Sequence, residues 1–139
     1  MISTDDKMAI HELIARFCHC SDYGDWDGLR RLFTADTVTE IEGGDMRFPG
    51  IEAQVEHAKA SDEQAEGKNR HYYFNIVITT EGDAVYADYM MVNVNAGHAP
   101  MSSQIVVTGC HRDRVEKTSE GWKFAHRYVM FDQSVKMTF

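Results

Sequence analysis

Cysteine is scarce in this sequence, with three residues at positions 18, 20 and 110. An odd number of cysteines without a second closely spaced pair does not form a disulfide framework. Thiolate zinc sites join two pairs whose members are about two to four residues apart, and here only Cys110-His111 could complete Cys18-His19-Cys20. We therefore expect no disulfide and no bound metal, and three reduced cysteines in a cytoplasmic protein.

The sequence also lacks a long apolar run and an excess of basic residues. No segment approaches the ~20 apolar residues of a membrane helix, and the first residues contain no apolar signal core, so we expect neither membrane insertion nor export. The 22 acidic residues outnumber the 14 basic ones, which gives a formal net charge of −8. Because such a surface repels phosphate backbones, nucleic acid is not an expected partner.

The rest of the composition is that of an ordinary globular domain. Of the 139 residues, 43% are hydrophobic and 26% are charged, which argues against a disordered chain. A chain of this length buries roughly 68% of its unfolded surface and can hold a core. There is no internal repeat or linker, and the two prolines, Pro49 and Pro100, stand beside glycine or alanine in expected loops. We therefore expect one domain over residues 1–139.

Helical spacing dominates the first half of the chain. Ser3 and Asp6 fit a helix-capping pattern. The apolar residues that follow at i, i+3, i+4 and i+7 are Ile10, Leu13, Ile14 and Phe17. This stripe predicts a helix over about residues 4–20. The other elements expected in this half are a short helix over 26–33, a strand over 37–42 ended by Gly43-Gly44, and a helix over 51–64, followed by a polar loop.

After residue 70 the pattern changes to the period of two that is typical of strands. The expected strands cover residues 71–80, 84–95, 104–116 and 122–135. Adjacent antiparallel strands after a helical half predict an α+β fold, in which the twisted sheet curls around the helices and leaves a pocket. The first of these strands is apolar on both faces, with Tyr72, Phe74, Ile76 and Ile78 on one and Tyr73 and Val77 on the other. Both faces then need cover, which predicts a homo-oligomer, a dimer or trimer.

Four segments carry a resemblance to a known superfamily. They are DYGDWDGLRRLF at residues 22–33, DTV at 36–38, Arg70-His71 and GWKFA at 121–125. With this order of elements, the chain resembles the SnoaL-like branch of the nuclear-transport-factor-2-like superfamily. The resemblance implies a cone-shaped barrel, in which a curved, mostly antiparallel sheet wraps around N-terminal helices and encloses a pocket. It is weak evidence for activity, because this fold hosts dehydratases, isomerases, cyclases, hydrolases and non-catalytic subunits.

Within this branch the chain is similar to scytalone dehydratases and hexachlorocyclohexane dehydrochlorinases. Both carry a catalytic aspartate just before a segment like Asp25-Trp26-Asp27-Gly28-Leu29, and that aspartate falls on Asp22. Both also carry a catalytic histidine at the start of the first long strand, which falls on His71. A histidine can take a proton at neutral pH, and an aspartate bonded to its other ring nitrogen fixes the tautomer. From spacing alone, a solvated loop aspartate and a surface histidine are the better explanation of these residues.

The resemblance implies a substrate-binding role for five further residues. Phe17 stands where the dehydrochlorinases have a lysine, Asn93 lies near the second histidine of the dehydratases, and Arg127 matches a last-strand arginine of the dehydrochlorinases. Glu40 loosely matches the base of ketosteroid isomerases, and His111 has a pocket-facing register.

Alternatives stay open for several of these residues. His111 could be a satisfied sheet histidine, and Arg127 could form a surface ion pair with Asp88 or Asp113. His126 alternates with Arg127, so only one of the two can point inward. The scytalone dehydratase tyrosines are replaced here by Ser21 and Ile41. The histidines at positions 11, 19, 57 and 98 read as surface residues.

Two functional hypotheses follow. In the first, the protein is a cofactor-independent, dehydratase-like lyase or isomerase, in which His71 removes a proton from a small, mostly apolar ring compound and Asp22 orients the imidazole. In the second, it is a non-catalytic ligand-binding module or a subunit that supports an oxygenase. The two differ in whether Asp22 and His71 meet inside a closed pocket.

Overall fold

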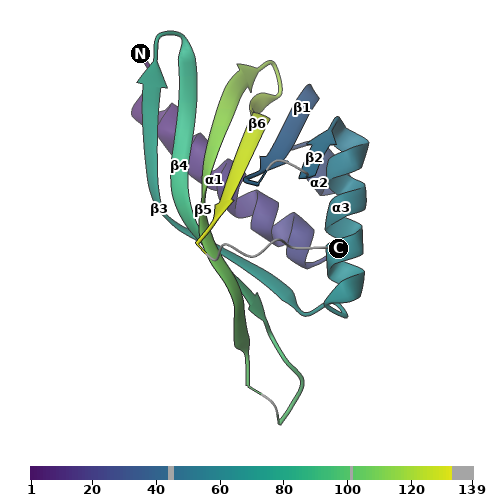
Figure 1. Cartoon of the computed structure of the whole chain (residues 1–139). Helices are drawn as coiled ribbons and strands as arrows, with labels where there is room; N and C mark the ends of the chain where they lie inside the picture. Colours follow the sequence, from purple (N-terminus) through teal and green to yellow (C-terminus); the bar gives the residue numbers. More distant parts are fainter. Residues whose placement is uncertain (44–45, 101, 133–139) are drawn as a thin grey trace.

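The structure, a computed structural model, describes residues 1–43, 46–100 and 102–132. Within these stretches the chain forms three helices and six strands (Figure 1). They are α1 (Thr4–Asp22), α2 (Trp26–Arg30), β1 (Phe33–Ile41), β2 (Met46–Pro49), α3 (Ile51–Gln64), β3 (Asn69–Glu81), β4 (Ala84–Asn95), β5 (Gln104–Thr118) and β6 (Gly121–Phe131). None of the described helices is long and apolar enough to span a membrane.

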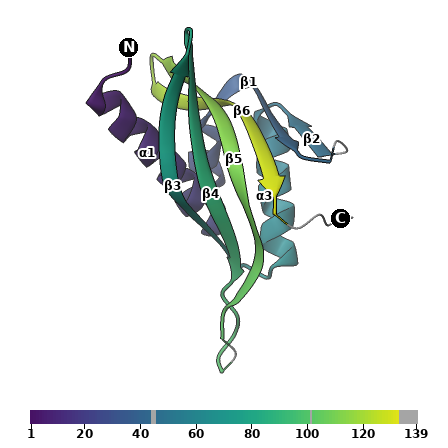
Figure 2. The same cartoon turned by 60° about the vertical axis from the view of Figure 1, so that its left-hand side comes forward.

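The six strands form one mixed, mostly antiparallel sheet in the order β2-β1-β6-β5-β4-β3. Every neighbouring pair is antiparallel except β1 and β6, which run parallel. The sheet curves, and the helices lie on one side of it, while its other side faces the viewer in Figure 2 without a helix over it. The predicted α+β cone is therefore confirmed.

The first helix begins with the predicted capping pattern. The Ser3 hydroxyl accepts the Asp6 N–H at 3.0 Å, and the Asp6 carboxylate accepts the Ser3 N–H at 3.0 Å. Ile10, Leu13 and Ile14 are buried against the core, as the stripe predicts. The helix continues two residues beyond the predicted end and stops at Asp22, so its last side chain is a buried carboxylate.

The core lies between α1 and the inner face of the sheet. Phe33 from β1 and Phe124 from β6 are its largest fully buried side chains, and their rings lie 5.7 Å apart. Trp26 and Trp122 pack against this cluster while staying partly exposed. The indole N–H of Trp122 donates to Asp6 at 3.0 Å, which ties the start of α1 to β6.

Several predicted boundaries differ from the structure, and others fall outside the described residues. The second helix ends at Arg30 rather than Phe33, because the Leu32 N–H bonds back to the Leu29 carbonyl and β1 then begins. Pro49 closes β2 instead of standing in a loop, and β2 is a four-residue edge strand too short for a period to show. Gly44 and residues 133–135, in the predicted strand end and the last strand, lie outside the described residues.

The faces of β3 were predicted wrongly after Phe74, because a bulge follows that residue. The β3–β4 register shifts between Phe74 and Val77, and Asn75 takes a left-handed φ of 56°. An inserted residue reverses the alternation. Ile76 and Ile78 therefore join Tyr73 on the core side. The large hydrophobic side chains left exposed on the outer side of β3–β5 are Tyr72, Phe74, Val77, Met90, Ile105 and Val106.

Candidate active site

The carboxylate at the end of α1 holds the first inward side chain of β3. Asp22 Oδ1 lies 2.5 Å from His71 Nδ1, and Asp22 Oδ2 accepts the backbone N–H of His71 at 2.7 Å. Asp22 is buried and His71 is partly buried, with exposed side-chain fractions of 6% and 14%. The structure thus brings together the two residues that the resemblance pairs, although they are far apart in the sequence.

The end of α1 is built to place this carboxylate. Gly24 takes a φ of 73°, a left-handed conformation that glycine adopts without strain and that turns the chain out of the helix. The Asp25 N–H then bonds the Cys20 carbonyl at 3.0 Å. Arg70, next to His71, donates to the Asp22 carbonyl at 3.4 Å and lies over the Tyr23 ring. Helix end and strand start are therefore held together by backbone as well as side-chain contacts.

The carboxylate also decides which nitrogen of His71 can act as a base. An ionised carboxylate only accepts hydrogen bonds, so the proton of a neutral His71 ring lies on Nδ1. Nε2 then keeps its lone pair. Among the described residues none bonds to Nε2, and His71 lines a cavity. This arrangement orients a base and stabilises the imidazolium that forms when it takes a proton.

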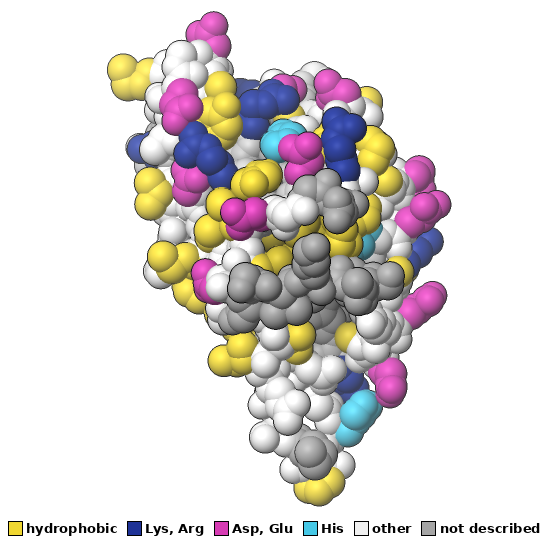
Figure 3. Space-filling model, in the orientation of Figure 1, with side chains coloured by type: hydrophobic (Ala, Val, Ile, Leu, Met, Phe, Trp, Pro, Cys, Tyr) yellow, Lys and Arg dark blue, Asp and Glu magenta, His cyan; other side chains and the backbone are white. Residues whose placement is uncertain are grey.

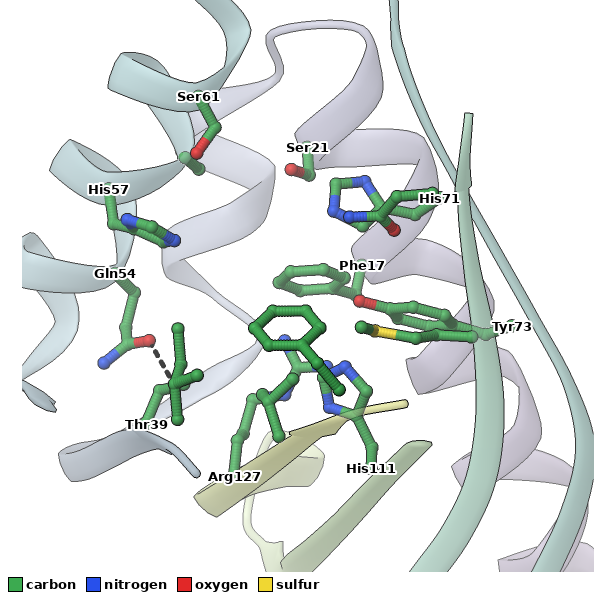
Figure 4. Close-up of a pocket in the computed structure, with 16 residues that line it drawn as sticks. Phe17, Ser21, Thr39, Gln54, His57, Ser61, His71, Tyr73, His111 and Arg127 are labelled. Atoms are coloured by element: carbon green, nitrogen blue, oxygen red, sulfur yellow. Dashed lines mark hydrogen bonds between the residues drawn. The ribbon is translucent and has the colours of Figure 1, made fainter. Parts of the chain in front are cut away.

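The cavity lies between α1, α3 and the inner face of the sheet, and Figure 4 shows side chains from these elements converging on it. Its volume is about 110 Å³. Four of the predicted substrate-binding residues line it: Phe17, Asn93, His111 and Arg127. Asp22 is not part of the lining, because it stands behind His71.

Arg127 lines the cavity and belongs to a buried ion pair. Arg127 Nε donates to Asp113 Oδ2 at 3.2 Å, and the exposed fractions of the two side chains are 3% and 0%. Tyr89 donates to the same oxygen at 2.5 Å and accepts from Arg127 Nη2 at 2.8 Å. The guanidinium also lies 4.0 Å from the Phe17 ring centroid. The open choice for Arg127 is therefore settled: it pairs with Asp113, inside the protein and not on its surface.

The two charges of this pair stabilise one another. Burial alone would raise the pKa of Asp113, but the Arg127 guanidinium and its hydrogen-bond donors outweigh burial and hold that pKa below its usual range. Burial alone would lower the pKa of Arg127, but Asp113 and Tyr89 keep it above its ordinary value. Both groups stay ionised, so a fixed positive charge lines the cavity and is balanced by a fixed negative charge that does not line it.

His111 stands beside this pair with its ring held flat against Tyr89. The two rings stack at 4.9 Å with an interplanar angle of 8°. His111 Nδ1 lies 3.3 Å from Arg127 Nη2 and 3.4 Å from Asp113 Oδ1. Burial lowers the pKa of His111 to about 4, and the positive Arg127 acts in the same direction. The imidazole is therefore neutral at neutral pH.

Asn93 is opposite His71 in the β3–β4 register and carries an unused acceptor. Its Oδ1 is buried, and no described residue donates a hydrogen bond to it. A buried acceptor without a partner costs about 1–3 kcal/mol. A hydroxyl or N–H of a ligand in the cavity would remove that cost.

Glu40, a predicted substrate-binding residue, does not line the cavity. Its carboxylate lies 2.7 Å from His126 Nε2 and 3.4 Å from Arg47 Nε. Alternation along β1 accounts for this placement, since Thr39 and Ile41 line the cavity and the residue between them points to the other face. His126 likewise faces away from the cavity, opposite to Arg127.

One cavity residue was missed, because His57 was predicted to lie on the surface. It lines the cavity from α3, and its ring stacks on Phe48 at 4.2 Å. Burial lowers the pKa of His57, and the nearby His71 adds to that shift. The sequence contains a signal for this position, because the lining residues on α3 have the spacing of one helix face. They are Gln54, His57, Ala58 and Ser61. Gln54 also accepts the Thr39 hydroxyl at 2.6 Å.

None of the three cysteines lines the cavity. All three are free thiols. Burial raises the pKa of Cys18 to about 12, so it stays protonated at neutral pH. Over the described ranges, no group of three or more His, Cys, Asp or Glu side chains is placed to hold a metal ion.

Comparison with known proteins identifies the architecture. A family model described as "SnoaL-like domain" matches residues 3–128. A cystatin-like-fold protein of unknown function from Nostoc punctiforme is 22% identical with a TM-score of 0.82, covering 99% of this chain and 98% of its own. Aln2 from a Streptomyces species is 21% identical with a TM-score of 0.83, covering 95% of this chain and 94% of its own.

A third solved structure is described by a function. The beta subunit of a putative aromatic-ring-hydroxylating dioxygenase from Novosphingobium aromaticivorans is 20% identical with a TM-score of 0.74, covering 94% of this chain and 91% of that one. At these identities the structural likenesses show the fold alone. No curated protein matches the sequence.

Proposed function

This chain belongs to the SnoaL-like domain family, and we propose that it is a cofactor-independent lyase or isomerase that uses His71 as its base and Asp22 to orient it. One observation carries the proposal. The Asp22 carboxylate binds Nδ1 and the backbone N–H of His71, which leaves Nε2 as the basic nitrogen of a side chain that lines a cavity. A carboxylate–imidazole pair of this kind is suited to general acid–base catalysis.

The proposed reaction begins with a C–H bond next to a carbonyl group. His71 Nε2 takes the proton, and the electron pair of the C–H bond forms a carbon–carbon double bond. In an elimination, a hydroxyl on the next carbon leaves and takes the proton back from the imidazolium, so that water is the second product. In an isomerisation, the same proton returns to a different carbon. Acid–base help of this kind contributes about 10²–10⁴-fold, so the substrate must already carry an acidified proton.

The cavity limits the size of this substrate. A cavity of roughly 150 Å³ with apolar walls accepts one benzene molecule, and the cavity here measures about 110 Å³. Its apolar lining comes from Phe17, Tyr73, Met91, Val129 and Phe131. The comparison sets one ring as the upper limit, and we propose a single-ring compound of mostly apolar character as the substrate.

A panel of single-ring β-hydroxy ketones and activated halides tests the proposal. We expect the purified protein to convert at least one member without added cofactor. In D2O we also expect deuterium to enter the carbon next to the carbonyl, because His71 exchanges the proton it has taken with solvent. Nuclear magnetic resonance follows both events. A panel in which no compound turns over and none exchanges deuterium would contradict the proposal.

The second candidate is a non-catalytic binding module or oxygenase-supporting subunit. The observation that favours it is the likeness to the dioxygenase beta subunit. In such a role neither Asp22 nor His71 has a chemical task, so single-ring compounds would bind without turnover or exchange. The same panel therefore separates the two candidates.

We also propose that the outer face of the sheet pairs with a second copy of the chain. The exposed side chains of Tyr72, Phe74, Val77 and Ile105 make this face apolar, and Figure 3 shows hydrophobic side chains along the side where β3 and β4 lie. The helices cover the opposite face, so they cannot shield it. Stable homodimers bury over ~1,200 Å² in total.

Sedimentation equilibrium at micromolar concentration should therefore give twice the chain mass of 15.9 kDa. Val77→Asp, which places a charge within the apolar face, should give the monomer mass. The control Met8→Asp makes the same kind of change on the exposed side of α1 and should stay dimeric. A monomeric wild-type protein would contradict the pairing.

A further inference from the structure

We propose that His111 donates a hydrogen bond from Nε2–H to the carbonyl oxygen of the substrate, next to the carbon from which His71 removes the proton. This inference rests on the proposed function, because it adds an electrophile to the same reaction. It also narrows the substrate class to ring ketones and related carbonyl compounds. An alkyl halide without a carbonyl would gain nothing from such a donor.

The position of the His111 proton follows from its neighbour. A guanidinium donates hydrogen bonds and never accepts them. Because Arg127 Nη2 lies 3.3 Å from His111 Nδ1, that nitrogen acts as the acceptor. Asp113 Oδ1 lies slightly farther from Nδ1, at 3.4 Å, and forms no hydrogen bond of good geometry with a described residue. The single proton of the neutral ring therefore lies on Nε2.

The neutral state of the ring makes it a donor and not an acid. Burial and the Arg127 charge outweigh Asp113, which acts in the opposite direction, and keep the pKa of His111 near 4, so a second ring proton is absent at neutral pH. The charged and titratable groups that face it are Arg127, Asp113, Tyr89, Tyr73 and His71. Since Arg127 occupies Nδ1, the ring cannot pick up a proton there while it releases one from Nε2. It can polarise an oxygen without transferring its proton.

The ring is also fixed in place, and it shares the neighbour Tyr73 with the base. Stacking on Tyr89 holds its plane. The ring of Tyr73 lies 5.0 Å from the His111 ring on one side and 5.7 Å from the His71 ring on the other. Both histidines line the same cavity, as Figure 4 shows. A ring ketone in that cavity can therefore meet the base at its α-carbon and the donor at its oxygen, where negative charge develops.

Two substitutions at His111 distinguish the effect of its N–H donor from the effect of its aromatic ring. In His111→Phe the stacking surface stays and the N–H is lost, so we expect kcat to fall by about 10²–10³-fold. In His111→Gln the side-chain amide still offers an N–H, so kcat should recover to within about tenfold of the wild-type value. The exposed His98→Gln is the matched control and should leave kcat unchanged. Equal kcat for His111→Phe and the wild type overturns the proposal.

Two measurements on His111 do not depend on turnover. First, the ¹⁵N spectrum of the histidines should show the His111 proton on Nε2, with His111→Gln used to assign its signals. Second, the infrared stretch of ¹³C-carbonyl cyclohex-2-enone should shift to lower frequency when it binds the wild-type protein. The shift should persist in His111→Gln and disappear in His111→Phe.

These measurements also tell the inference apart from the proposed function. A proton on Nδ1, no binding of the ketone, or an equal carbonyl stretch in wild type and His111→Phe overturns the donor role, whatever the catalytic results. A shifted stretch with no turnover or deuterium exchange across the ketone panel leaves the donor in place and contradicts the base role of His71.

Discussion

Replacing Asp22 by asparagine will lower kcat by about 10⁴-fold, as the matching change does in a Ser-His-Asp triad. The reason lies in the two hydrogen bonds that the carboxylate accepts, one from the His71 backbone N–H and one from its ring. An amide has only one oxygen. If that oxygen takes the backbone N–H, the amide NH2 faces Nδ1, and the ring proton moves to Nε2, where the base is needed.

Steady-state kinetics on a substrate from the panel measures this effect. His71→Ala should lose about 10²–10⁴-fold, and the double variant should be little worse than the more damaging single one, because the pair acts as a unit. Asp27→Asn makes the same chemical change at an exposed carboxylate nearby and should keep full activity. If Asp22→Asn keeps wild-type turnover, the proposed pair is not the catalytic one.

Replacing Arg127 by methionine will lower the free energy of unfolding by about 3–5 kcal/mol. The change leaves Asp113 fully buried and without its positive partner, and it also removes the donor to the Tyr89 hydroxyl. Breaking one side of a buried pair costs more than the pair itself contributes, because the remaining charge stays desolvated. The midpoint of urea unfolding, at an unchanged m-value, reports the loss.

A second substitution tests that reason. Arg127→Met combined with Asp113→Asn removes both charges, so part of the lost stability should return. Arg112→Met is the matched control, because its ion pairs with Glu81 and Asp88 are partly exposed and should cost at most about 1 kcal/mol. A loss for Arg127→Met no larger than that of the control would show that Asp113 is not held by this contact.

Local patterns in the sequence predict most of the secondary structure. The capping residues Ser3 and Asp6 and the stripe after them lie within one helix, and period-two segments give the strands β3 to β6. The bulge at Asn75 was not predictable, because asparagine signals a turn as readily as an inserted strand residue. The short β2 depends on pairing with β1, which no local pattern carries.

The site was only partly accessible to the same reasoning. Spacing alone cannot join Asp22 to His71, since one ends a helix and the other begins a strand, and the resemblance supplied that pair. Which face of the sheet Glu40 occupies depends on the pairing of β1 with β6. His57 is predicted to lie on the surface, although its neighbours on the same side of α3 line the cavity with it. Arg127 stayed undecided because a charged strand residue is buried only when a partner such as Asp113 meets it across the sheet.

The parallel pairing of β1 with β6 has a consequence for folding during synthesis on the ribosome. Val38 pairs with His126, and the Phe124 N–H bonds the Leu32 carbonyl at 2.8 Å. β1 is synthesised early, but the edge of β1 that pairs with β6 stays uncovered until β6 has been synthesised. Until then its unpaired backbone is open to other nascent chains. The slow step of biogenesis should be the docking of β6 between β1 and β5, after which the cone closes.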